Sequence, residues 1–243
     1  MRAVLTAADL PDPMPRFGPV YADRPVLAVG ETKFHGEAVA AVAAETEEAA
    51  DAAVALVRVQ TEELPAVLTV DAARAPDAPL VQDPALRDGP LAHTNTLREW
   101  HFGWGDVAAA TAECVVENTY TFPMVTHFAI EPHVFLAAPE QGGVTVWSAI
   151  QHPYLLQSGI AALLGLPISK VRVIAPDPGG AFGGKQHAKF EPLLAFLALR
   201  TGRPVRLALT LAQTFQAVRR TGYQVHMRTG FDAEGTLVFQ DVD

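Results

Sequence analysis

The glycine-rich stretch PDPGGAFGGK, at residues 176–185, is the part of the sequence with the clearest chemical potential. Its four glycines let the backbone approach a ligand closely, and their N–H groups can converge on an anion near the start of a helix. The phosphate-binding loop of NTPases requires Ser or Thr directly after the lysine, as a magnesium ligand. Gln186 stands there, which disfavours that loop. A tight turn that needs glycine for backbone reasons alone is the other alternative.

The cysteine content restricts the redox chemistry of the chain. Cys114 is the single cysteine in 243 residues, so the sequence can hold no internal disulfide, four-thiolate zinc site or iron–sulfur cluster of its own. Electron transfer would therefore depend on an organic or borrowed cofactor. Because Cys114 lies in an alternating apolar stretch, we expect a buried structural thiol rather than a nucleophile.

Two further candidates allow more than one interpretation. His127, Glu131 and His133 in HFAIEPH resemble a set of metal ligands. Pro132 interrupts any helix that would align them, which favours a role at a domain junction instead. Lys185 either holds an anion or is solvated.

Regular elements are expected on both sides of the glycine-rich stretch. A strand over Lys170–Ile174 precedes it, and a helix from about His187 to Thr201 follows it. Gln151 stands just before a second helix, which Gly165 ends.

The remaining pattern predicts an α+β protein with a domain at 1–75, a proline-rich connector at 76–100 and a second domain at 101–243. The expected elements are strands at 26–29 and 38–43, a helix after Thr46, a short helix from Asp106, strands at 113–122, 133–138, 144–149 and 204–209, and two strands within 222–242 around a turn at 232–235.

Composition and charge narrow the class of protein. The chain is 49% hydrophobic and 19% charged, with a net charge of −9, which indicates a globular protein and excludes disorder as the main theme. Its basic residues are scattered, so we expect no nucleic-acid partner. No apolar run is long enough to span a bilayer and no secretory signal is recognisable, which predicts a cytoplasmic location.

The sequence resembles the large subunit of the xanthine dehydrogenase and aldehyde oxidase family, the molybdenum hydroxylases, from about residue 3 to residue 243. The resemblance is colinear over PDPGGAFGGK, GEAVAAVAAET, VQTEELPAV, GDVAAATAECVVENTYTF, HFAIEPHVFLA, SAIQHPYLLQSGIAALLGLPISKVRVIAPD and TGRPVRL. It implies part of an a/b hammerhead domain followed by the first part of the molybdopterin-binding domain.

The resemblance also implies roles for individual residues. Gln151 matches a glutamine that hydrogen-bonds an oxygen ligand of molybdenum. Gly180, Phe182 and Gly183 match the loop that approaches the metal and its pterin, whose dithiolene sulfurs hold the molybdenum. Gln186 matches a substrate-side position where many xanthine-oxidising members carry glutamate, so purine oxidation is not expected.

The implied reaction is oxidation of an aldehyde or N-heterocycle with water as the oxygen source. The family's catalytic glutamate base lies in a segment that is absent here, so we expect a fragment or split piece that contains no catalytic base and is inactive alone. Iron–sulfur clusters and FAD are expected on partner chains or domains: the remainder of the large subunit, an iron–sulfur subunit and a flavin subunit. The alternatives are a non-catalytic remnant or binding module of the same fold and, behind it, a phosphate-loop nucleotide-binding protein.

Overall fold

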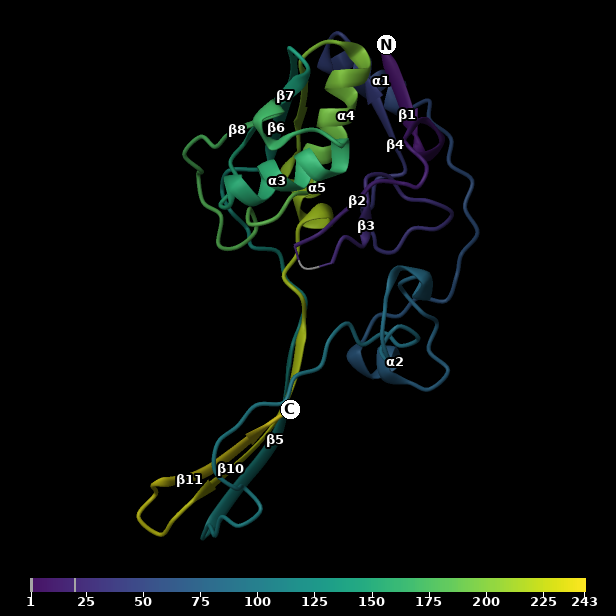
Figure 1. Ribbon diagram of the computed structural model, residues 1–243. Coiled ribbons are helices and arrows are strands. Elements are labelled where there is room, and N and C mark those ends of the chain that lie inside the picture. Colours follow the sequence, from purple (N-terminus) through teal and green to yellow (C-terminus); the bar gives the residue numbers. More distant parts are fainter. Residues whose placement is uncertain (1, 20) are drawn as a thin grey trace. The chain divides into compact units, whose positions relative to one another are not determined.

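The computed structural model describes residues 2–19 and 21–243, which form two compact units (Figure 1). The first unit contains the chain up to Glu63 together with Thr126–Arg219, and the second contains Leu64–Val125 and Arg220–Asp243. Helices occur beside mainly antiparallel strands, which confirms the α+β class. The units divide the chain differently from the boundaries at 75 and 100, which stay a prediction.

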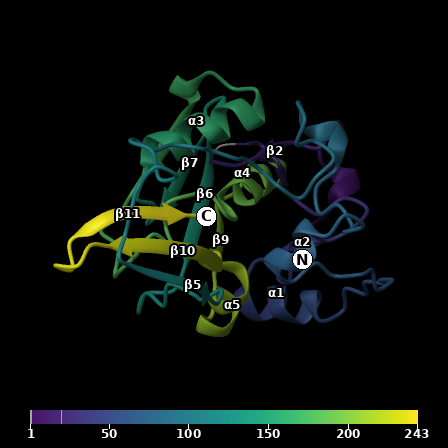
Figure 2. The same ribbon diagram turned by 90° about the horizontal axis from the view of Figure 1, so that it is seen from below.

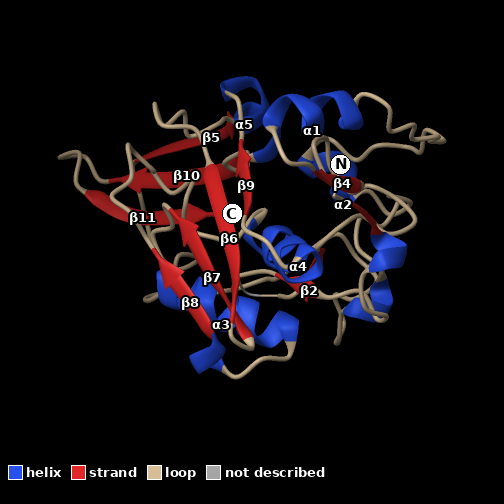
Figure 3. Ribbon diagram, turned by 90° about the horizontal axis from the view of Figure 1, so that it is seen from above, coloured by secondary structure: helices blue, strands red, loops and turns tan. Residues whose placement is uncertain are grey.

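A four-stranded sheet and the helices around it form the centre of the first unit (Figure 3). The elements of this unit are β1 (Ala3–Thr6), β2 (Arg16–Phe17), β3 (Arg24–Pro25), β4 (Ala40–Ala43), α1 (Glu47–Val54), β6 (Val134–Glu140), β7 (Gly143–Ser148), α3 (Pro153–Leu164), β8 (Val171–Ile174), α4 (Glu191–Thr201), β9 (Val205–Ala208) and α5 (Leu211–Ala217). The sheet order is β8-β7-β6-β9, in which only the β7–β8 pair is parallel. The antiparallel pair β1–β4 is separate.

Helix α4 joins two hydrophobic cores within this unit. Leu194 and Ala198 belong to the core beside the four-stranded sheet. Leu193 and Leu197, one position earlier in each turn, belong to the core formed with β1 and β4. A helix that packs against two cores must be apolar over a wide part of its circumference. Burial in both cores holds the segment that follows the glycine-rich loop in place.

Two expected elements of the first unit differ in the structure. Val26 and Leu27 are buried in the core, but they lie outside any strand, because burial of an apolar run does not by itself require ladder pairing. Helix α4 begins at Glu191 rather than near His187. Pro192 explains the later start, since proline fits the first turn of a helix and disfavours helical backbone before it.

The second unit contains an antiparallel sheet of three strands, β5 (Cys114–Phe122), β10 (Tyr223–Phe231) and β11 (Leu237–Val242), and the short helix α2 (Val70–Arg74). Strand β10 lies between β11 and β5 (Figure 2). The expectation of a buried Cys114 is wrong: the thiol is exposed, because every residue of β5 is exposed. The helix expected from Asp106 is only a turn, in which the Asp106 carboxylate accepts the N–H groups of Ala108 and Ala109.

Helix α3 provides a stability prediction. Gly159 lies within α3, and a Cβ built on it meets no atom within 4 Å. Gly159→Ala should therefore raise the free energy of unfolding by about 0.5–1 kcal/mol, because alanine has a smaller entropy cost in a helix. Gly165→Ala is the matched control: its site is equally open, but its φ of +64° should make alanine destabilising by about 1 kcal/mol. Urea unfolding measures both, and a destabilising Gly159→Ala would contradict the prediction.

Candidate functional site

The HFAIEPH segment and the glycine-rich loop, distant in sequence, are joined at Glu131 in the first unit. The Glu131 N–H donates to the Gly179 carbonyl at 3.2 Å, and the Gly179 N–H donates to Glu131 Oε2 at 2.7 Å. A Cβ on residue 179 would lie 2.7 Å from the Glu131 Cβ. Glycine is therefore required there by close approach of two segments.

Lys185 closes the same contact from the other end of the loop. Its Nζ lies 2.5 Å from Glu131 Oε2, and its side chain is 3% exposed while that of Glu131 is 39% exposed. The hydrogen bond from Lys185, together with that from Gly179, holds the pKa of Glu131 below its usual value. The solvated alternative for Lys185 is thus wrong. The ion pair also occupies the ammonium group that a phosphate-binding loop would direct at its ligand.

His133 supports the loop from below the surface. The residue is 6% exposed, and its Nε2 lies 3.2 Å from the Gly184 carbonyl, an arrangement in which a neutral ring donates through Nε2. Its buried Nδ1 has no hydrogen-bond partner among the described residues. Burial, with the positive charge of Lys189, lowers the pKa of His133 to about 4. No group of three His, Cys, Asp or Glu side chains that could hold a metal occurs within residues 2–19 and 21–243. The hydrogen bonds of Glu131 and His133 to Gly179 and Gly184 make HFAIEPH a support for the loop.

Gln151 lies beside the loop, because it stands in the short segment between the end of β7 and the start of α3. Its N–H donates to the Lys185 carbonyl at 2.8 Å. The residue is exposed, and its side-chain amide makes no hydrogen bond within the part of the chain that the structure describes. Both its donor and its acceptor are consequently available to a ligand.

The centre of the loop has an unusual backbone. Gly180 and Gly183 have φ values of +100° and +89°, which glycine adopts without strain. Phe182 has a φ of +51° and is 75% exposed, so a bulky residue is kept in a disfavoured conformation without burial to compensate. The N–H groups of Phe182 and Gly183 donate no hydrogen bond to any described residue. Gln186 follows directly, and its N–H donates to the Gly183 carbonyl at 3.3 Å.

The structure therefore places Gln151 beside the loop that contains Gly180, Phe182, Gly183 and Gln186, in which Phe182 is exposed. Sequence reasoning missed the supports beneath it. Glu131 and His133 were considered as metal ligands or as residues of a domain junction, and not as supports of the loop. The buried Glu191, which accepts hydrogen bonds from the Ser148 hydroxyl and the Lys189 N–H, was not noticed at all. A charged residue just before Pro192 at a helix start was the available signal.

Comparison with known proteins identifies the family of the chain. Residues 90–243 match the molybdopterin cofactor-binding domain, and residues 1–65 match the aldehyde oxidase and xanthine dehydrogenase a/b hammerhead domain. A probable xanthine dehydrogenase subunit of Bacillus subtilis is 35% identical over 100% of this chain and 32% of its own length. The nicotinate dehydrogenase large molybdopterin subunit of Eubacterium barkeri is 32% identical over 91% of this chain and 51% of its own length.

A solved structure shows the same fold. The aldehyde oxidoreductase of Desulfovibrio gigas superposes with a TM-score of 0.81 and 28% identity, over 97% of this chain and 26% of that chain. The chain thus spans between about a quarter and a half of the length of these proteins. None of the helices in the described residues has the length and apolar character that a membrane crossing needs. With its hammerhead part, its molybdopterin-binding part and the loop between β8 and α4, the chain belongs to the xanthine dehydrogenase and aldehyde oxidase family of molybdenum hydroxylases.

Proposed function

We propose that the chain forms one side of a molybdenum–molybdopterin site in an oxidoreductase that oxidises an aldehyde or N-heterocycle, with water as the oxygen source. The observation that carries this proposal is that Gln151 lies beside the loop 179–186, which Glu131 and His133 hold in place by hydrogen bonds. Relatives of the chain are named as xanthine and nicotinate dehydrogenases. Purines are less favoured because Gln186 is neutral and cannot act as an acid.

The residues present suit such a cofactor in their donor chemistry. The cofactor supplies its own dithiolene sulfurs to the metal, so the protein needs hydrogen-bond donors rather than thiolates. The unpaired side-chain amide of Gln151 and the unpaired N–H groups of Phe182 and Gly183 are donors of this kind. Gly180 lets the loop turn close to a ligand. The strained, exposed Phe182 is typical of a functional position.

The residues of this chain orient the cofactor, and the cofactor and the partner subunits supply the redox chemistry. When bound, the molybdenum cofactor accepts two electrons from the substrate. We assign Gln186 to the substrate side, and we assign no catalytic base within the chain, so these 243 residues alone should be inactive. With Cys114 as the single cysteine, the electrons must leave through iron–sulfur clusters and FAD on partner subunits or further domains. The free, exposed thiol suits a reducing cytoplasm.

Gln151→Ala tests the proposal. A tagged chain purified from its native source, with whatever copurifies, should contain molybdenum and pterin, and Gln151→Ala should lower both several-fold. Its stability should change by no more than about 0.5 kcal/mol, because the side chain is exposed and unpaired. Elemental analysis and pterin fluorescence measure the cofactor. Gln60→Ala, an equally exposed glutamine of the same unit, is the control that should retain it.

Two results would contradict the proposal. A native preparation free of molybdenum, pterin and partner subunits would favour the non-catalytic remnant. Oxidation of an aldehyde or heterocycle by the purified 243-residue chain alone would show that the base and the electron acceptor lie within it.

A further inference from the structure

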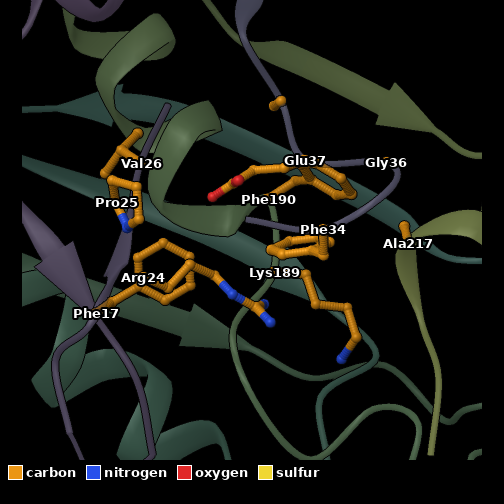
Figure 4. Close-up of a pocket in the computed structure, with 11 residues that line it drawn as sticks. Phe17, Arg24, Pro25, Val26, Phe34, Gly36, Glu37, Lys189, Phe190 and Ala217 are labelled. Carbon is orange, nitrogen blue, oxygen red and sulfur yellow. The ribbon is translucent and has the colours of Figure 1, made fainter. Parts of the chain in front are cut away.

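A second candidate site lies in a small pocket of the first unit, which we call the arginine–lysine pocket (Figure 4). It is lined mainly by Phe17, Arg24, Phe34, Glu37, Lys189 and Phe190 and has a cavity volume of about 30 Å³. A buried water needs roughly 10–15 Å³ measured in this way. The pocket therefore has room for two or three water-sized groups, about the size of a carboxylate.

Arg24 is held in the pocket by aromatic side chains. Its guanidinium carbon lies 5.8 Å from the ring centre of Phe17 and 5.4 Å from that of Phe34, distances typical of cation–π contacts. These rings fix the side chain without satisfying its N–H donors. In the part of the chain that the structure describes, no ion pair joins Arg24 to a carboxylate.

Lys189 supplies a second positive charge to the same pocket. Its Nζ donates to the His187 carbonyl at 2.9 Å, which leaves two of its three N–H donors. Burial chiefly, and the charges of Arg24 and Lys185, lower the pKa of Lys189 to about 8, while Glu191 acts in the opposite direction. At pH 7 roughly nine in ten molecules therefore still carry a protonated Lys189.

The acid that lines the pocket, Glu37, forms an ion pair with neither Arg24 nor Lys189. Its carboxylate accepts the backbone N–H of Lys33 at 2.6 Å. Like charges brought together in a partly buried space favour an anion, which can accept hydrogen bonds from both at once. Phe34, which lines the pocket and is 37% exposed, offers a flat apolar surface to the group that carries the anion.

We propose that the arginine–lysine pocket binds a small carboxylate, whose oxygens lie between Arg24 and Lys189 and whose apolar body rests on Phe34. The site goes beyond the proposed oxidation, since it needs neither molybdenum nor pterin. The whole 243-residue chain is therefore the protein to test.

Calorimetric titration with benzoate, at ionic strength matched with sodium chloride, is the direct experiment. Benzoate should bind, and acetate should bind more weakly because it lacks the ring that rests on Phe34. Arg24→Gln and Lys189→Met should each lower the benzoate affinity about tenfold or more. Arg200→Gln, which removes an exposed charge from α4 outside the pocket, should leave the affinity unchanged.

An NMR titration of isotopically methylated lysines adds a readout specific to Lys189. Saturation with benzoate should raise the pKa of Lys189, and chloride at the same ionic strength should not. If Lys189→Met does not fold, two measurements still test the proposal: the benzoate affinity of Arg24→Gln, whose substituted side chain is exposed, and the pKa of Lys189 in the wild-type chain. The proposal is overturned by absence of benzoate binding, by binding that neither substitution weakens, or by inorganic phosphate binding more tightly than benzoate.

Discussion

Acidification from pH 6.5 to pH 4 should destabilise the protein by about 3 kcal/mol through His133 alone. Burial lowers the pKa of this imidazole from 6.5 to about 4 in the folded chain. Between those values the unfolded state binds more protons than the folded state, so the free energy of unfolding rises with pH. The physical reason is that protonation places a charge and an unpaired N–H on the buried Nδ1.

Urea unfolding at several pH values measures this effect. His133→Leu should be less stable at neutral pH, because it loses the hydrogen bond to Gly184, but its stability should depend much less on pH above 4. A shallow slope remains from His187, whose pKa is also lowered, chiefly by burial. His101→Gln is the control, since its side chain is 89% exposed, and it should keep the wild-type slope. An unchanged slope in His133→Leu would refute the assignment to His133.

Removing the carboxylate of Glu131 should destabilise the first unit by about 2 kcal/mol and free the glycine-rich loop. Glu131→Gln leaves the charge of Lys185, which is 3% exposed, without its anion. The expected loss is below that for a fully buried pair because the Glu131 side chain is 39% exposed to solvent. Chemical denaturation at pH 7 gives the change in stability, and hydrogen exchange at the Gly179 amide should become faster.

The sign of the pH dependence follows from the lowered pKa of Glu131. The contribution of its carboxylate is fully present above the ordinary value of 4.5 and is lost as the pH falls through the lower, folded-state value. Glu131→Gln should therefore differ from wild type at pH 7 and converge with it in strong acid.

A double variant and a matched control separate the ion pair from general effects. Glu131→Gln combined with Lys185→Met should recover part of the lost stability, because no charge then remains buried. Glu117→Gln removes the same group from an exposed pair with His226 and should cost no more than about 0.5 kcal/mol. Equal losses of stability in Glu131→Gln and Glu117→Gln would mean that the buried ion pair contributes no more to stability than the exposed one.

Local sequence signals predicted the elements that carry the site. Gly165 marked the end of α3, and the strands expected at 170–174, 133–138 and 144–149 correspond to β8, β6 and β7. Helix α5 was missed although Thr210 and Gln213 form the capping pattern at its start. Such features depend on neighbouring residues, so they can be recognised in the sequence itself.

The supports of the loop could not be derived in the same way. Glu131 is separated from Lys185 by 54 positions, and its bond to Lys185 depends on how β6 and the loop after β8 are placed by the sheet. The sequence offered two motifs, each with several chemical interpretations. The tertiary structure decided that the HFAIEPH segment supports the glycine-rich loop.

By itself the sequence determined the α+β class, the family resemblance and the residues of the glycine-rich loop, all of which rest on residue types and local spacing. Only the tertiary structure decided that Lys185 is buried and paired, that His133 is buried with a lowered pKa, and that Arg24 and Lys189 line one pocket. Burial and ionisation depend on which distant segments exclude water from a side chain, and that is a property of the folded chain.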